Sequence, residues 1–409
     1  MLRGVALLGI LAMNIRSFAA PFAAYINPLA MYEYAGASRA AYWATTLVFD
    51  TKMMSIFSML FGAGAIIYSG KTSDGKISAT RLWYRRNLWL LIIGLIHAYL
   101  IWVGDILVVY SLCAFFFLWW TRNLPAWVLV LLATVMFAVG GLMMIGEAAA
   151  FEMLSAEERT EEASQWQPTH AEVDEEIEIY RDGYLGIAAH RAPAALYIQT
   201  VYFVAFFLWR SGGMMVLGQA LMKWRVLTGA RSSGFYMALA LSGYLVGLPL
   251  VWIGMQRLEA VRFAVPERYT LDLYNHFGSI AVALGHVGLL LWLFRARPTS
   301  IWFDRLAAVG RMALTNYLMQ SVICTTLFYG YGFNLFGRLD YAWQLVVVAA
   351  VWAIQLVASP WWLRHFQFGP VEWLWRWLTY GQRPPLRRGV RAPDLPLAPL
   401  AAQADVESN

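Results

Sequence analysis

Long apolar runs, separated by short polar segments, account for most of the chain. A helix needs about 20 mainly apolar residues to cross the ~30 Å hydrocarbon core of a bilayer, and many of these runs reach or approach that length. The predicted spans lie at about 2–20, 52–69, the two halves of 88–120, 125–146, 194–222, 234–253, 273–294, 307–331 and 342–359. The pattern therefore predicts an all-α fold, a polytopic transmembrane helix bundle of about ten spans.

The third and fourth spans form a hairpin around which the rest of the chain is organised. His97 lies inside the first run, and Gly104-Asp105 joins the two runs at an outer turn. An ionisable group at membrane depth costs roughly 2.5–3.5 kcal/mol, so it usually faces protein or a wet cavity. On a continuous helix His97 and Asp105 would be about 12 Å apart and roughly 80° around the axis, so we expect no direct contact, although both could line one cavity. The alternatives are a packing histidine and an aspartate that caps the second helix.

The first run admits two interpretations. Arg3, an apolar stretch and small residues together resemble a signal peptide, but Asn14 and Arg16 interrupt the apolar region that such a signal needs. A first transmembrane helix at about 2–20 is the interpretation that these polar residues favour.

Basic clusters indicate how the spans are oriented. They follow the second, sixth and eighth spans, and they include Lys71, Lys76, Arg81, Arg85, Arg86, Lys223, Arg225, Arg231, Arg295, Arg297 and Arg305. Loops that carry Lys and Arg stay on the cytoplasmic side, so ten spans place both termini in the cytoplasm. This distribution explains the net charge of +6 without a nucleic-acid partner.

The chain divides into four regions. Residues 1–146 hold spans one to five, and 193–382 hold spans six to ten and a terminal helix. Between them, 147–192 is acidic and carries two capping boxes, Ser155–Glu158 and Thr169–Glu172, which predict a small helical cap outside the cytoplasm. The Pro-rich tail, 383–409, is expected to be a disordered cytoplasmic segment.

Composition supports a membrane protein and excludes several classes. The chain is 60% hydrophobic and 14% charged, which is atypical of a soluble enzyme. Cys113 and Cys324 lie inside apolar runs, so no disulfide framework is expected. Neither a nucleotide-phosphate loop nor a metal-ligand spacing occurs, so we predict neither an ATP-driven pump nor a metal site.

Polar residues within or beside the spans are the candidate substrate-binding groups. They are Asn14, Arg16, Lys52, His286, Arg311, Asn316, Gln320, Glu372 and Arg376. Each also has an interpretation other than substrate binding. The amides could hold helices together, and Arg311 could snorkel or bind a lipid headgroup. Glu372 and Arg376 could form a surface pair. We predict that Asn14 and His286 share with His97 and Asp105 one cavity open to the outside.

Several of these stretches resemble the YeiB-like family of bacterial membrane proteins, which is catalogued as a domain of unknown function. They include LRGVALLGILAMN at 2–14, GLIHAYLIWVGDIL at 94–107 and the Gly-Pro-x-Glu-Trp-x-x-Arg run at 369–376. The resemblance implies a multi-pass protein of the bacterial inner (cell) membrane. The first helix, at Arg3, Gly4 and Asn14, is also similar to that of the heparan-α-glucosaminide N-acetyltransferase group, which transfers acetyl groups across a membrane from coenzyme A with a luminal histidine.

Three functions remain open at this stage. The resemblance favours a transmembrane acyltransferase that uses acetyl-coenzyme A or another acyl-coenzyme A, with His97 as base by analogy and Asp105 tuning its surroundings. The same polar residues could instead line the path of a transporter or permease for a small polar solute, or the protein could be a non-catalytic scaffold. The expected partners are the lipid bilayer, an unidentified small molecule and a second copy of the chain.

Overall fold

The computed structural model describes residues 1–69 and 78–389, and in these ranges the chain is helical without a named strand. The part before the cap contains α1 (Leu2–Ala19), α2 (Phe22–Ile26), α3 (Gly36–Val48), α4 (Lys52–Ser69), α5 (Ala79–Leu100), α6 (Leu107–Cys113), the π-helical segment η1 (Ala114–Leu118), α7 (Trp119–Thr121) and α8 (Ala126–Met153). The cap contains α9 (Ala156–Ser164) and α10 (His170–Arg181). The rest contains α11 (Tyr184–Gln199), η2 (Phe203–Phe207), α12 (Leu208–Lys223), α13 (Ser233–Ala260), α14 (Val265–Ala296), α15 (Ile301–Arg311), α16 (Ala313–Phe328), α17 (Tyr341–His365) and α18 (Pro370–Tyr380).

Seven helical stretches among the described residues are long and apolar enough to cross a membrane. They are Leu2–Ala19, Gly36–Tyr68, Ala126–Met153, Tyr184–Lys223, Ser233–Ala260, Glu267–Ala296 and Tyr341–His365. The other three predicted spans correspond to α5, to the shorter apolar stretch from α6 to α7, and to α15 with α16. The all-α bundle is thus confirmed, and the count of about ten spans is approximate.

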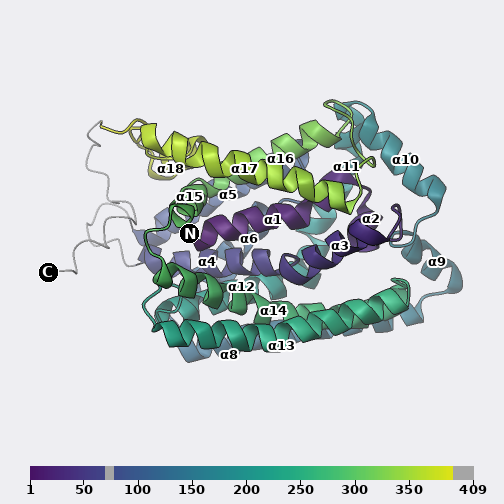
Figure 1. Ribbon diagram of the computed structural model, residues 1–409, viewed down its shortest axis with the longest axis horizontal. Helices are drawn as coiled ribbons and strands as arrows, with labels where there is room; N and C mark the ends of the chain where they lie inside the picture. The colour runs from purple at the N-terminus through teal and green to yellow at the C-terminus, as the bar shows by residue number, and fades with distance from the viewer. Residues whose placement is uncertain (70–77, 390–409) are drawn as a thin grey trace.

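The long helices run side by side along the longest axis of the molecule (Figure 1). The two cap helices, α9 and α10, lie at one end, which we call the cap end. The start of α1 and helix α18 lie at the opposite end, which we call the terminal end.

The cap forms as its sequence predicts. Both capping boxes are present, with the side chains of Ser155 and Thr169 accepting from the amides of Glu158 and Glu172. The amide of Thr169 donates back to Glu172 and holds the pKa of that carboxyl below its ordinary value. On α10, one apolar face is buried against the cap end of the bundle.

Three details differ from the prediction. The second span begins earlier than the predicted residue 52, because α3 and α4 together form one candidate span, Gly36–Tyr68. The ninth span is broken at Met312, between α15 and α16. The start of the tail is bound rather than disordered, because the amide of Gln367 donates to the carbonyl of Leu386; residues 390–409 lie outside the described residues.

Helices α4 and α12 approach each other so closely that glycine is required on both. A Cβ at Gly62 would lie 1.9 Å from the carbonyl oxygen of Met215, and one at Gly218 would lie 2.0 Å from the carbonyl oxygen of Met59. Small residues at helix crossings let membrane helices pack backbone to backbone. This crossing fixes α4, which carries Lys52 at its start, against the centre of the bundle.

We expect Gly62→Ala to destabilise the folded protein by about 1–3 kcal/mol, because the helices must separate to admit the methyl group. Gly64→Ala is the matched control, since a Cβ there meets nothing within 4 Å. Thermal unfolding of both variants in the same detergent measures the difference. Equal melting temperatures would show that the crossing is looser than these distances require.

Candidate functional site

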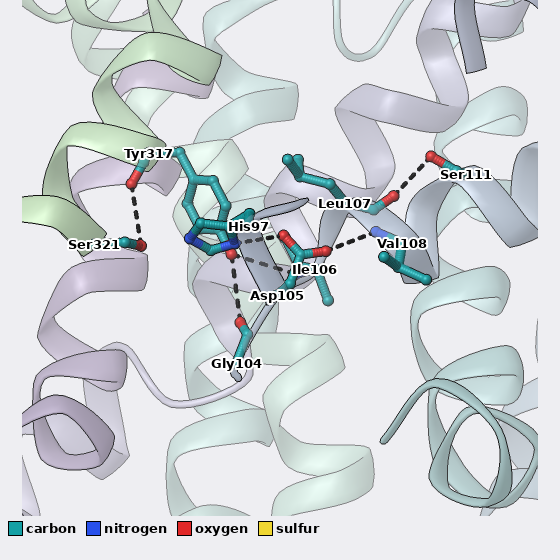
Figure 2. Close-up of polar contacts among 9 residues, drawn as sticks. All are labelled: His97, Gly104, Asp105, Ile106, Leu107, Val108, Ser111, Tyr317 and Ser321. Carbon is teal, nitrogen blue, oxygen red and sulfur yellow. Dashed lines mark hydrogen bonds and ion pairs between the residues drawn. The ribbon is translucent and has the colours of Figure 1, made fainter. Parts of the chain in front are cut away.

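His97 and Asp105 form a buried hydrogen-bonded pair. Nδ1 of His97 lies 2.7 Å from Oδ2 of Asp105, and the two residues are 1% and 3% exposed (Figure 2). The other carboxylate oxygen of Asp105 accepts from the amide of Val108 at 2.8 Å. Asp105 therefore orients the imidazole and caps the start of α6 at the same time.

The expectation that these two side chains would not touch was wrong. It assumed a continuous helix, but α5 ends at Leu100 and residues 101–106 fold back along it. This reversal returns Asp105 to the level of His97 and buries it, instead of leaving it at an outer turn.

The pair leaves one imidazole nitrogen free. A carboxylate that accepts from Nδ1 holds the proton there and leaves the lone pair on Nε2 available. Nε2 of His97 is buried and has no hydrogen-bond partner among the described residues. The rings of Trp102 and Tyr317 lie beside it, with centroids 6.3 and 5.1 Å from that of the imidazole. A buried imidazole nitrogen without a partner, beside aromatic rings, is suited to general-base chemistry.

Neighbouring helices fix the backbone that carries the pair. The Tyr317 hydroxyl on α16 donates to the carbonyl of Gly104 and accepts from the amide of Ile106, both at 3.3 Å (Figure 2). On the other side, the buried Arg191 of α11 donates to the carbonyls of Ile101 and Tyr99. The segment between α5 and α6 is therefore held at both ends.

A cavity of about 100 Å³ lies elsewhere in the bundle. Its walls come from α1, α2, α3, α13, α14 and the connecting segments near the cap end. Its lining includes Arg16 but none of His97, Asp105, Asn14 and His286. This cavity is therefore not the one predicted for those four residues.

Lys52 lies next to this cavity, whereas His286 and Asn14 are not among its lining residues. Lys52 donates to Asn275, which is one of the lining residues. His286 bridges the Tyr244 hydroxyl at 2.7 Å and the carbonyl of Val48 at 3.0 Å. Asn14 is half-buried on α1, and its side chain makes no hydrogen bond to a described residue.

Two amide candidates join α16 to α17. Nδ2 of Asn316 donates to the Ser359 hydroxyl at 3.0 Å, and Nε2 of Gln320 donates to Oε1 of Gln355 at 2.9 Å. Gln355 in turn donates to the carbonyl of Asn316. These bonds agree with the alternative that the amides hold helices together.

Glu372 has a structural partner that its sequence spacing does not indicate. Its Oε1 accepts from the amides of Leu314 and Thr315 at 2.7 and 3.0 Å, and its Oε2 accepts from the Thr315 hydroxyl at 2.5 Å. The carboxylate thus caps α16 from α18, next to the break at Met312. The alternative of a Glu372–Arg376 surface pair was wrong: no ion pair joins them in the described chain, and Arg376 lies over the ring of Phe368.

Sequence reasoning missed three residues around these sites. Arg210 is 1% exposed within an apolar run, and a lone arginine there is itself a signal of function. Asp50 lines the cavity, and its position just before the second span gave no signal. Tyr317 is one of several tyrosines in the spans, and only the fold places it beside His97. No group of three or more possible metal ligands occurs among the described residues.

Comparisons with known proteins identify the family of the chain. The family model described as "Protein of unknown function (DUF418)" matches residues 221–382. The protein YeiB of Escherichia coli (strain K12) is 33% identical over 383 residues, which cover 92% of this chain and 94% of that protein. The protein YxaH of Bacillus subtilis (strain 168) is 31% identical over 396 residues, covering 93% and 92%. No solved structure matches the chain significantly. The identity over nearly the full length of both relatives shows that the chain belongs to the YeiB-like family of DUF418 proteins.

Proposed function

We propose that this protein is a transmembrane acyltransferase in which His97 is the general base. The observation that carries the proposal is the buried pair in which Asp105 holds Nδ1 of His97 and Nε2 has no partner. A carboxylate–imidazole pair with a free second nitrogen is the arrangement that activates hydroxyl and amine nucleophiles in many enzymes.

The proton transfers of the reaction need only His97, Asp105, the acceptor and the acyl-coenzyme A. Nε2 of His97 takes a proton from the hydroxyl or amine of the acceptor as its oxygen or nitrogen attacks the thioester carbonyl carbon. The carbon–sulfur bond then breaks, the coenzyme thiolate leaves, and it takes the proton from His97. The Asp105 carboxylate stabilises the transient imidazolium through the Nδ1 hydrogen bond. Because His97 is almost fully buried, the side chains around it must move before a substrate can reach Nε2.

Two arginines at the terminal end are suited to bind the phosphates of an acyl-coenzyme A. Arg311 ends α15, Arg376 lies on α18, and neither makes an ion pair to a described carboxylate. Guanidinium groups free of carboxylates are well suited to phosphate oxygens. Beyond the break at Met312, Tyr317 lies four residues after Ala313, the first residue of α16, or about 6 Å along that helix. A thioester bound from this end therefore has a short distance to cover.

The direct test is label transfer by the purified wild-type protein. Radiolabelled acetyl-coenzyme A is supplied with a panel of hydroxyl- and amine-bearing acceptors, and we expect label on at least one acceptor. Protein that neither binds the coenzyme nor transfers label to any acceptor would overturn the proposal.

The acyl donor is cytoplasmic, so the terminal end faces the cytoplasm in this proposal. Both native cysteines are buried, so single cysteines can be introduced at exposed positions. In intact cells we expect a membrane-impermeant maleimide to label Gln165→Cys in the cap but not Thr299→Cys between α14 and α15. The reverse pattern would contradict this orientation.

Transport of a small polar solute is a second candidate, supported by a different observation. Arg16, Lys52 and Arg210 are all buried, and they extend from the cavity into the bundle. Buried ionisable groups in series are typical of solute and ion pathways in membranes. Uptake of labelled solutes into proteoliposomes, measured beside the acyl-transfer assay, distinguishes the two functions.

A further inference from the structure

The cavity near the cap end is a separate compartment from the His97–Asp105 pair. On α1, Arg16 points into the cavity, whereas Phe18 stacks on Trp102 with ring centroids 4.1 Å apart. Two residues correspond to about 200° around a helix, so the cavity and the pair lie on different faces of α1. What the cavity binds is thus a question independent of the acyltransferase proposal.

The arginine that faces the cavity has no carboxylate partner among the described residues. Arg16 is 6% exposed, and both of its hydrogen bonds run from Nη2, to the carbonyl of Tyr42 at 3.0 Å and to the Thr46 hydroxyl at 3.2 Å. Its guanidinium also lies 4.0 Å from the centroid of the Tyr42 ring. All of these partners are uncharged, so they orient the cation without neutralising it.

Two more buried basic residues lie outside the lining of the cavity, and their hydrogen-bond partners are uncharged. Lys52 is 0% exposed and donates to the carbonyl of Thr46 at 2.7 Å and to Oδ1 of Asn275 at 2.8 Å. Arg210 donates to the carbonyl of His276 and to two serine hydroxyls.

The carboxylates of the cavity do not balance these charges. Asp272 pairs with Arg268 at 3.1 Å, and that pair is neutral by itself. Asp50 accepts from the side-chain Nδ2 of Asn275 at 3.0 Å. It is the one remaining acidic group of the lining. Arg16 and Arg210 alone therefore outnumber the single unpaired carboxylate. A buried charge without a counter-charge costs several kcal/mol, and this cost is relieved when an anion binds.

We propose that this cavity binds a small organic anion whose carboxylate or phosphate group meets the guanidinium of Arg16. A cavity of about 100 Å³ has room for such a group. Tyr34 and Phe263, whose rings meet edge-on in the lining, form a wall for the apolar part of the ligand. The Tyr34 hydroxyl is buried without a partner in the described chain, and it supplies a further donor.

The test measures binding to the full-length protein, purified in detergent, by calorimetry at constant ionic strength. The probes are acetate, benzoate, succinate, inorganic phosphate, glycerol phosphate and dihexanoyl phosphatidylglycerol, with acetamide, benzamide and glycerol as neutral analogues. We expect at least one anion to bind and its neutral analogue not to bind. Binding of the soluble anions assigns the site to a free solute, and binding of the phospholipid alone assigns it to a lipid headgroup.

Three variants of the cavity and one control locate the binding. Arg16→Gln should weaken it by about 10- to 100-fold, as expected for a lost charge-assisted hydrogen bond, while Arg16→Lys should retain part of it. Leu271→Trp should block the cavity with all charges in place. Arg39→Gln removes an exposed cation of α3 and should leave binding unchanged. If no probe binds the wild type, or if binding survives in both Arg16→Gln and Leu271→Trp, the inference is wrong.

Discussion

His97→Gln is expected to lower the rate of acyl transfer by about 10²–10⁴-fold, the usual contribution of a general base. Glutamine can still donate one hydrogen bond to Asp105, so the fold and the loop between α5 and α6 should be retained. The measurement is the initial rate of label transfer from acetyl-coenzyme A by purified protein, with the melting temperature recorded for the same samples.

Two further variants make this result specific. Asp105→Asn should also slow the reaction, because an amide no longer stabilises the imidazolium at Nδ1. His365→Gln is the matched control, since His365 is exposed near the end of α17 and its side chain bonds only to the carbonyl of Trp361 in the same helix. A His97→Gln protein with the melting temperature and rate of the wild type would show that His97 is a packing residue.

Glu372→Ala is expected to destabilise the protein strongly. The change removes the acceptor for the amides of Leu314 and Thr315 at the start of α16. Each buried amide left without an acceptor costs about 1–3 kcal/mol, so the two together give a large drop in stability. Thermal unfolding in detergent, monitored by tryptophan fluorescence, measures the loss.

A double-mutant cycle shows whether the effect runs through this cap. Thr315→Val removes the hydroxyl that donates to Oε2 of Glu372. The two changes should be less than additive when combined, because the hydroxyl bond can be lost only once. Leu374→Ala, at an exposed position of α18, is the control for the helix itself. Strict additivity would place the effect of Glu372 elsewhere.

The helices could be predicted from the sequence because apolar length and capping residues are local signals. The spans, the acidic cap and both capping boxes follow from residues that lie close together in the chain. The break at Met312 gave no such signal. It depends on Glu372, which lies more than 50 residues later and caps α16 across the fold.

The candidate site shows the same limit. His97 and Asp105 were recognised separately, as ionisable residues in an apolar setting. Their contact was missed because it depends on where α5 ends and on a six-residue reversal of the chain. The alternative that Asn316 and Gln320 hold helices together agrees with the structure, because amides on a membrane helix commonly bond to polar groups on a neighbouring helix.

Sided proteoliposomes test the central claim most directly. Labelled acetyl-coenzyme A is sealed inside vesicles in which the terminal end of the protein faces the lumen, and acceptors are supplied outside. Label is expected on an external acceptor with the wild-type protein, and the signal should be lost with His97→Gln. Absence of transfer in every arrangement, together with uptake of a solute that depends on His97, would contradict it and identify a transporter.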